Sequence, residues 1–136
     1  MGLVHTEITL KNSADVMLAR GGYRKAEDIR QMTVEALVDT GAWTLVIGED
    51  IRDKLGLEVT GARPGRLANG LKAVSDVAGP VEVWWKDRFV NCDALVLPGA
   101  KNVLLGAFPL EAMDLMVDPK GEKVVGAHGD EIEHYI

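Results

Sequence analysis

Apolar and polar residues alternate along several short stretches of this chain, which is typical of β-strands with one buried face. Residues 4–10 alternate throughout, with Ile8 and Leu10 on the apolar face. Residues 29–38 form a second strand-like stretch, and residues 43–47 form a short apolar run that indicates a buried strand. The pattern predicts further strands at residues 16–19, 80–86, 89–97, 101–105, 115–117 and 123–125.

Turn-forming residues separate these strands. Asn69-Gly70 lies between two extended segments, and because both residues tolerate positive φ, residues 66–79 predict a projecting hairpin centred on this pair. Residues 12–15 predict a turn, and residues 61–65, which contain Pro64, predict a flexible break.

Two segments change to a helical pattern. In residues 48–57 the acids come first, Ile51 and Leu55 are four positions apart, and Gly56 is a suitable C-cap. Residues 109–113 predict one helical turn, because proline favours the first position of a helix. Many short strands with one or two short helices predict an all-β protein, either a barrel or a sandwich.

The composition changes this picture little, but it excludes some partners. The chain has 136 residues, about half of them apolar, which suits a single domain over residues 1–136. Its formal charge of −6 argues against nucleic acid or an anionic membrane surface as a partner. The basic cluster at residues 20–30 is interrupted by Glu27 and Asp28, so we expect a solvated loop there.

Cys92 is the sole cysteine and cannot form an internal disulfide, which fits a reducing compartment. It lies in a strand-like run, so we expect a buried structural thiol rather than a nucleophile. The chain has no stretch long enough to span a membrane and no signal-peptide pattern at its start. These features predict a cytoplasmic protein.

The candidate chemistry lies at Asp39-Thr40-Gly41-Ala42, where the apolar strand 29–38 ends. A strand end followed by glycine places the acid on a tight loop. Asp, Thr and Gly are also ordinary turn residues, so the tripeptide alone is equally consistent with a structural turn. Other elements are needed to decide between these interpretations.

The wider arrangement resembles the retropepsin-like aspartic proteases, a group of single-domain enzymes that includes retroviral proteases and small bacterial and archaeal relatives. The resemblance covers residues 6–125 and is of the bacterial type. It rests on Asp39-Thr40-Gly41 with its flanking residues, the strand and helix that follow, the Asn69-Gly70 hairpin, and Leu104-Leu105-Gly106 with Val103 before it. Residues 126–136 would form an acidic C-terminal tail, whose Tyr135 and Ile136 either join a dimer interface or fray.

The resemblance implies a closed barrel, a homodimer and a peptide or protein substrate, without a cofactor. Asp39 would be the catalytic acid, and Thr40, Gly41 and Ala42 would support its loop. Asn69 and Gly70 would lie in a flap over the substrate. Leu104, Leu105 and Gly106 would pack behind the catalytic loop.

The proposed chemistry requires two chains. Hydrolysis of an amide by water needs one group that takes a proton from the water and another that protonates or polarises the carbonyl oxygen. Two neighbouring carboxyls that share one proton can do both. This sequence offers one Asp-Thr-Gly, so the second acid must come from another subunit in a two-fold homodimer.

Two residues depart from the family pattern. Trp43 stands where a small or polar residue is usual, which affects the shape of the substrate groove, and Ala107 replaces an arginine of the viral sequences, which affects how a dimer is stabilised. An alternative function is therefore a non-catalytic dimeric β-barrel that binds peptide or protein. A metal enzyme is a third alternative, but His5, His128 and His134 are scattered without metal-binding spacing, so we expect no metal site.

Overall fold

Short strands dominate the computed structural model, which describes residues 3–66 and 69–129. Within these residues the helical elements are α1 (Ser13–Arg20), a 3₁₀ turn η1 (Ala26–Asp28), α2 (Glu49–Leu55) and α3 (Ala107–Ala112). The strands are β1 (His5–Asn12), β2 (Gln31–Val38), β3 (Leu45–Ile47), β4 (Glu58–Arg66), β5 (Lys72–Trp85), β6 (Arg88–Val96), β7 (Val103–Leu105), β8 (Leu115–Asp118) and β9 (Lys123–Gly126).

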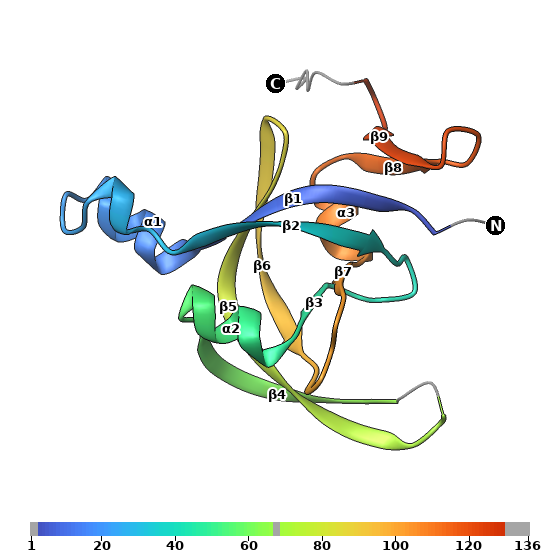
Figure 1. Cartoon of the computed structure of the whole chain (residues 1–136), viewed down its shortest axis with the longest axis horizontal. Coiled ribbons are helices and arrows are strands. Elements are labelled where there is room, and N and C mark those ends of the chain that lie inside the picture. Colours follow the sequence, from blue (N-terminus) through green and yellow to red (C-terminus); the bar gives the residue numbers. More distant parts are fainter. Residues whose placement is uncertain (1–2, 67–68, 130–136) are drawn as a thin grey trace.

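Six strands close into a barrel in the order β1-β2-β7-β3-β6-β5, because β1 also pairs with β5. The closing pairs are antiparallel and include Leu10 opposite Val83. The long strand β5 continues beyond the barrel and pairs there with β4, so the two form a projecting hairpin (Figure 1). The predicted all-β class, the closed barrel and the hairpin are confirmed.

The core lies inside the barrel and is built from alternate residues of its strands. Leu10 and Val83 are fully buried, whereas the flanking Thr9, Lys11 and Trp84 are half-buried. Glu82 is an exception to this alternation, because it is buried and accepts a hydrogen bond from Trp84 Nε1. Each large aliphatic side chain buried in this way contributes about 1.5–3 kcal/mol. The adjacent tryptophans of β5 follow the same alternation, since Trp85 is buried and Trp84 stacks on Phe89 with ring centroids 4.7 Å apart.

The most extensive error of the sequence-based prediction concerns residues 13–20, which form helix α1 instead of a turn and a short strand. Asn12 caps this helix, because its side-chain oxygen accepts a hydrogen bond from the Asp15 backbone N–H at 3.1 Å. Asp15 in the first turn and Arg20 in the last turn also match the helix dipole. With α1, the described chain has three short α-helices rather than one or two.

A second error concerns residues 61–65, which belong to strand β4 and are not a flexible break. Pro64 lies opposite Val74, and the register shifts between Val59 and Gly61. Proline cannot donate a hydrogen bond to a neighbouring strand, so it is tolerated in β4 because this strand is the last in the sheet order.

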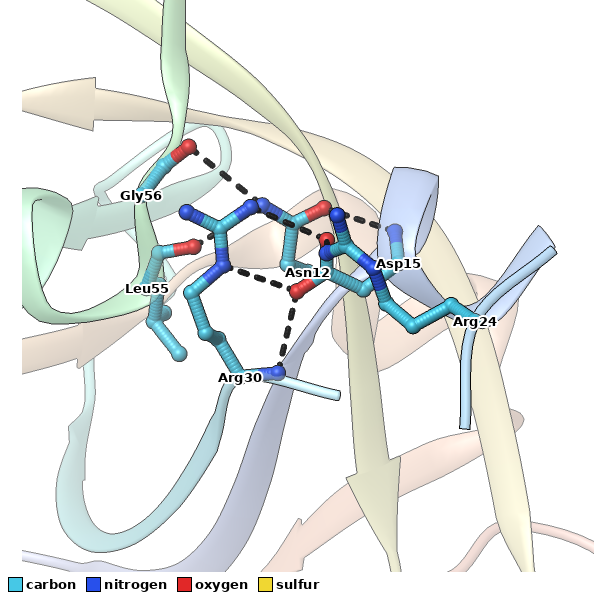
Figure 2. A network of polar contacts seen from close by, with 6 residues as sticks. All are labelled: Asn12, Asp15, Arg24, Arg30, Leu55 and Gly56. Carbon is cyan, nitrogen blue, oxygen red and sulfur yellow. Dashed lines mark hydrogen bonds and ion pairs between the residues drawn. The ribbon is translucent and has the colours of Figure 1, made fainter. Parts of the chain in front are cut away.

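The basic segment after α1 is also not simply solvated. Arg24 and Arg30 both form ion pairs with Asp15, whose side chain is only 1 % exposed. Figure 2 shows the two guanidinium groups converging on this carboxylate. Alternating charge along the sequence does not reveal this, because the acid lies nine and fifteen residues before its partners.

The other predicted elements agree with the structure. Helix α2 ends at Gly56, which adopts the left-handed conformation with φ of 61°. The 109–113 turn is part of α3, which begins two residues earlier, and β8 pairs with β9 as expected. In the part of the chain that the structure covers, no helix is long and apolar enough to cross a membrane.

The C-terminal region is described as far as residue 129. The buried Arg88 side chain donates from Nη1 to the Met113 carbonyl at 3.0 Å and from Nη2 to the Gly129 carbonyl at 3.2 Å. The first bond holds the end of α3, and the second fastens the segment after β9 to the barrel. The predictions for Tyr135, Ile136 and the rest of the tail from residue 130 lie outside the described residues.

Candidate active site

Asp39 directly follows β2, and its backbone still bonds to the neighbouring strand. Val38 pairs with Leu105 of the parallel strand β7, and the Asp39 backbone N–H donates to the Leu105 carbonyl at 3.0 Å. The backbone that carries the acid is thus held by a buried strand. Its side chain is half-buried, whereas Thr40 and Gly41 are exposed.

The loop after Asp39 is folded around the aspartate itself. The Gly41 backbone N–H donates to Asp39 Oδ1 at 2.9 Å, and the Ala42 backbone N–H donates to the Asp39 carbonyl at 3.0 Å. The first bond fixes the orientation of the carboxylate, and the second closes a tight turn. The loop thereby presents one oriented acid at the surface.

Gly106 supports this loop from behind. A Cβ atom at this position would lie 2.3 Å from the Thr44 carbonyl oxygen and 2.6 Å from the Ala42 carbonyl oxygen. Both contacts are far shorter than van der Waals distance, so only glycine allows the loop to pack this closely. Gly106 and Leu105 are buried, and Leu104 is half-buried. The structure therefore brings Asp39, Ala42, Leu105 and Gly106 together.

The start of α3 holds the loop by its backbone. The Ala107 N–H donates to the Ala42 carbonyl and the Phe108 N–H donates to the Trp43 carbonyl, both at 2.9 Å. Backbone N–H groups in the first turn of a helix have no partner within the helix, so the loop supplies partners for two of them. Ala107, which stands where the viral sequences have an arginine, thus contacts the loop through its main chain.

Thr44 is a supporting residue that the sequence analysis did not single out. It is 1 % exposed, and its hydroxyl donates to the Asp93 carbonyl in β6 at 2.9 Å. The sequence offers one sign of this role, because Thr44 is the one polar residue in the apolar run 43–47. The thiol of Cys92 lies in the same region, and burial raises its pKa to about 11, which agrees with the expected structural role.

Trp43 belongs to the same loop, lies at the surface and is 47 % exposed. The guanidinium carbon of Arg63, in β4, lies 4.2 Å from the centre of the indole ring. This is a cation–π contact between the loop and the projecting hairpin. The sequence analysis raised the shape of the groove at Trp43 but did not identify Arg63.

Asn69 and Gly70 lie at the end of the β4–β5 hairpin, whose last pair is Arg66 opposite Lys72. The Leu71 N–H donates to Asn69 Oδ1 at 3.0 Å, and Gly70 has φ of 84°. Their bonds stabilise the hairpin itself, whereas Arg63 makes the contact with the loop. In Figure 1 the hairpin tip and the loop that follows β2 lie toward the same side of the view.

The two histidines in the described part of the chain, His5 and His128, do not belong to a metal-binding cluster. Across residues 3–66 and 69–129 no cluster of three or more His, Cys, Asp or Glu side chains is arranged to hold a metal ion. His128 instead lies with Nδ1 2.7 Å from an Asp114 oxygen, on the exposed surface. His134 lies outside the described residues.

Known proteins resemble this chain in fold and in family. No curated protein matches the sequence. The chain superimposes on the crystal structure of the retroviral protease-like domain of Ddi1 from Leishmania major with a TM-score of 0.58 and 15 % identity, covering 92 % of this chain and 88 % of that one. At this identity the match establishes the retropepsin-like fold alone.

The family is established by the sequence itself. A family model described as aspartyl protease matches residues 27–108, which is more than half of the chain and includes both Asp39 and Gly106. The match spans both the Asp39 loop and the glycine packed behind it, and this chain belongs to the aspartyl protease family.

Proposed function

We propose that this protein is an aspartic endopeptidase whose catalytic centre forms when two copies bring their Asp39 side chains together on a two-fold axis. The observation that carries the proposal is a single oriented carboxyl, held on an exposed loop of an aspartyl protease barrel. One carboxyl cannot act as acid and base at once. A symmetric dimer supplies the second carboxyl as Asp39 of the other copy, so the chain needs no second catalytic acid of its own.

The chemistry follows from two carboxyls held close together. They cannot both ionise, so they keep one proton between them over a useful pH range. The ionised Asp39 takes a proton from a water molecule, which attacks the scissile carbonyl, and the protonated Asp39 of the other copy donates to the carbonyl oxygen. The tetrahedral intermediate then collapses as a proton passes to the leaving amine.

The neighbouring residues have roles that fit their exposure. Thr40 is exposed and directly follows the acid, so its hydroxyl is available to bond across the dimer and hold both loops. Gly41 leaves room for the substrate. The hairpin with Asn69 and Gly70 closes over an extended peptide and excludes water, as active-site lids do. A lone, buried cysteine suits a reducing compartment, so we place the enzyme in the cytoplasm.

The first experiment measures cleavage of a mixture of unstructured peptides by mass spectrometry between pH 3 and pH 8. The Asp39→Asn variant is compared with Asp28→Asn, which removes an exposed carboxylate on η1. We expect cleavage by the wild type and by Asp28→Asn, and a loss of at least about 1,000-fold in Asp39→Asn. A wild type that cleaves nothing over this range would rule out the proposal.

A second experiment tests the shared centre directly. Increasing amounts of Asp39→Asn protein are added to a fixed amount of wild type and allowed to exchange subunits. We expect activity to fall as mixed dimers form, because each contains only one ionisable acid. An enzyme that completes its centre within one chain would be unaffected by the added variant, and sedimentation would show it as a monomer.

One observation favours a second candidate function, a dimeric barrel that binds peptide without cleaving it. Trp43 and Arg63 stack at the edge of the loop and occupy space there. If this pair blocks the scissile position, Trp43→Ala would gain cleavage relative to an inactive wild type. The endopeptidase proposal instead expects the wild type to cleave and Trp43→Ala to cleave less.

A further inference from the structure

The outer part of the β4–β5 hairpin carries a charge opposite to that of the whole protein. Residues 61–75 contain Arg63, Arg66 and Lys72 and no acid, whereas the chain has a formal charge of −6. A local concentration of positive charge on an acidic protein attracts anionic groups to that place. The outer part of the hairpin that would cover the substrate is therefore cationic.

The register shows which of these charges faces the groove. In the N-terminal part of β5, Ala73 and Ser75 are half-buried, whereas Val74 is exposed, so the face with Ala73 and Ser75 is turned toward the barrel. Arg63 lies directly opposite Ser75, and paired residues of an antiparallel ladder point to the same face. Arg66 and Lys72 lie on the outer face. Arg63 is thus the inward-facing base of this segment.

Arg63 is held in place without being neutralised. Its guanidinium stacks on the Trp43 ring, 4.2 Å from the ring centre, next to the loop that carries Asp39. Throughout the described chain no carboxylate forms an ion pair with Arg63. Stacking uses the flat face of a guanidinium and leaves the N–H groups on its edge available for a carboxylate.

A hollow lies beside Ser75, the residue paired with Arg63. It has a volume of about 400 Å³ and lies between the hairpin and the segment after β6, lined by Ala73, Val74 and Ser75 of β5 and by residues 97–100. Gly65 lies opposite Ala73 on the inner face and adds no side chain there.

We infer that Arg63 selects peptide substrates with an acidic side chain, which its guanidinium binds from above the groove while Trp43 holds the guanidinium in position. This inference rests on the proposed function and names its substrate class. The ligand is a glutamate or aspartate of an extended peptide, because a single inward arginine recognises one carboxylate.

The test uses pairs of peptides that are identical except for Glu or Gln at one position, scanned through the four positions on each side of the cleaved bond. The wild type should cleave the Glu peptide with about tenfold or higher kcat/KM at one position, the range of a charge-assisted hydrogen bond. The preference should weaken as salt increases.

Three variants assign the preference to Arg63. Arg63→Gln should bring the Glu-to-Gln ratio to about one, and Arg63→Glu should invert it. Lys72→Gln is the matched control, since it removes a positive charge from the outer face of the same hairpin and should keep the preference. Arg63 and Trp43 are both exposed, so these changes should leave the fold intact, which thermal unfolding checks.

The outcomes separate this inference from the proposed function. Cleavage with no Glu preference, or a preference that survives in Arg63→Gln, overturns the role of Arg63 and leaves the endopeptidase standing. If the wild type cleaves nothing, the same labelled peptides are tested for binding by fluorescence anisotropy. Tighter binding of the Glu peptide that is lost in Arg63→Gln then supports acidic recognition by a protein that does not cleave, and equal binding overturns it.

Discussion

Arg30 binds the carboxylate of Asp15 through two side-chain hydrogen bonds, from Nε to Oδ2 at 2.8 Å and from Nη2 to Oδ1 at 2.9 Å. The Arg30 backbone N–H adds a third bond to Oδ2 at 3.0 Å, and Arg24 contacts the other oxygen (Figure 2). A forked pair of this kind is among the stronger polar interactions in proteins. It ties the segment that leads into β2 to helix α1.

The network extends to helix α2 through Asn12. The Asn12 side-chain amide donates to the Leu55 carbonyl at 2.8 Å and to the Gly56 carbonyl at 3.3 Å. These carbonyls lie at the end of α2, where they lack partners within the helix. Since Asn12 also caps α1, the two helices and the start of β2 are joined at one end of the barrel.

Replacing Asp15 should therefore destabilise the whole protein. In Asp15→Asn the two arginines lose a buried anionic partner, and we expect the free energy of unfolding to fall by about 2–4 kcal/mol. Urea unfolding monitored by circular dichroism measures this. Asp28→Asn removes an exposed carboxylate from the same segment and should change stability by less than about 0.5 kcal/mol. Equal effects of the two variants would contradict a structural role for the network.

The same pair makes stability depend on acid pH. The hydrogen bonds from Arg30 lower the pKa of Asp15 from 3.8 to about 2, against an opposing effect of burial. Because the folded-state pKa lies below the unfolded one, the contribution is complete above pH 3.8 and is lost as pH falls toward 2. Its size is about 2 kcal/mol. The stability difference between wild type and Asp15→Asn should thus shrink over this range, and a difference that stayed constant would show that Asp15 is not the titrating group.

Gly56 and Gly22 form a natural pair for a further test. Both have positive φ, but a Cβ at Gly56 would meet Arg30 Nη1 at 1.8 Å, whereas one at Gly22 would have nothing within 4 Å. Gly22→Ala should cost about 1 kcal/mol from backbone strain alone. Gly56→Ala should cost more, because Arg30 must also move away from Asp15. The additional cost should vanish in an Arg30→Ala background, and thermal unfolding of the single and double variants checks this.

These contacts show where local sequence patterns were sufficient. Helix α2 was predictable because its acids, its apolar spacing and Gly56 all lie within ten residues. The Asp39 loop was predictable for the same reason, since a strand end, an acid and a glycine follow each other directly. In both cases the turn itself is formed by neighbours in the sequence, although the Asp39 loop is also held from behind by Leu105, Gly106 and Ala107.

Elements that depend on distant partners were missed. Helix 13–20 has a local cap at Asn12, but the ion pairs that hold it join Asp15 to Arg24 and Arg30, nine and fifteen residues away, and the short apolar run does not reveal them. The strand at Pro64 depends on lying at the edge of the sheet. The contact between Trp43 and Arg63 joins residues twenty positions apart through the position of the hairpin, and no local pattern encodes it.

The close packing behind the Asp39 loop gives the last prediction, which concerns Gly106. A methyl group here would collide with the Ala42 and Thr44 carbonyl oxygens, which belong to backbone and cannot rotate away. Gly106→Ala should therefore displace the loop, lower stability by about 1–3 kcal/mol and reduce peptide cleavage by about 100-fold. Gly61→Ala is the stability control, because its added methyl group meets nothing within 4 Å. A Gly106→Ala protein that unfolded at the wild-type temperature and retained full activity would show that the loop does not need this support.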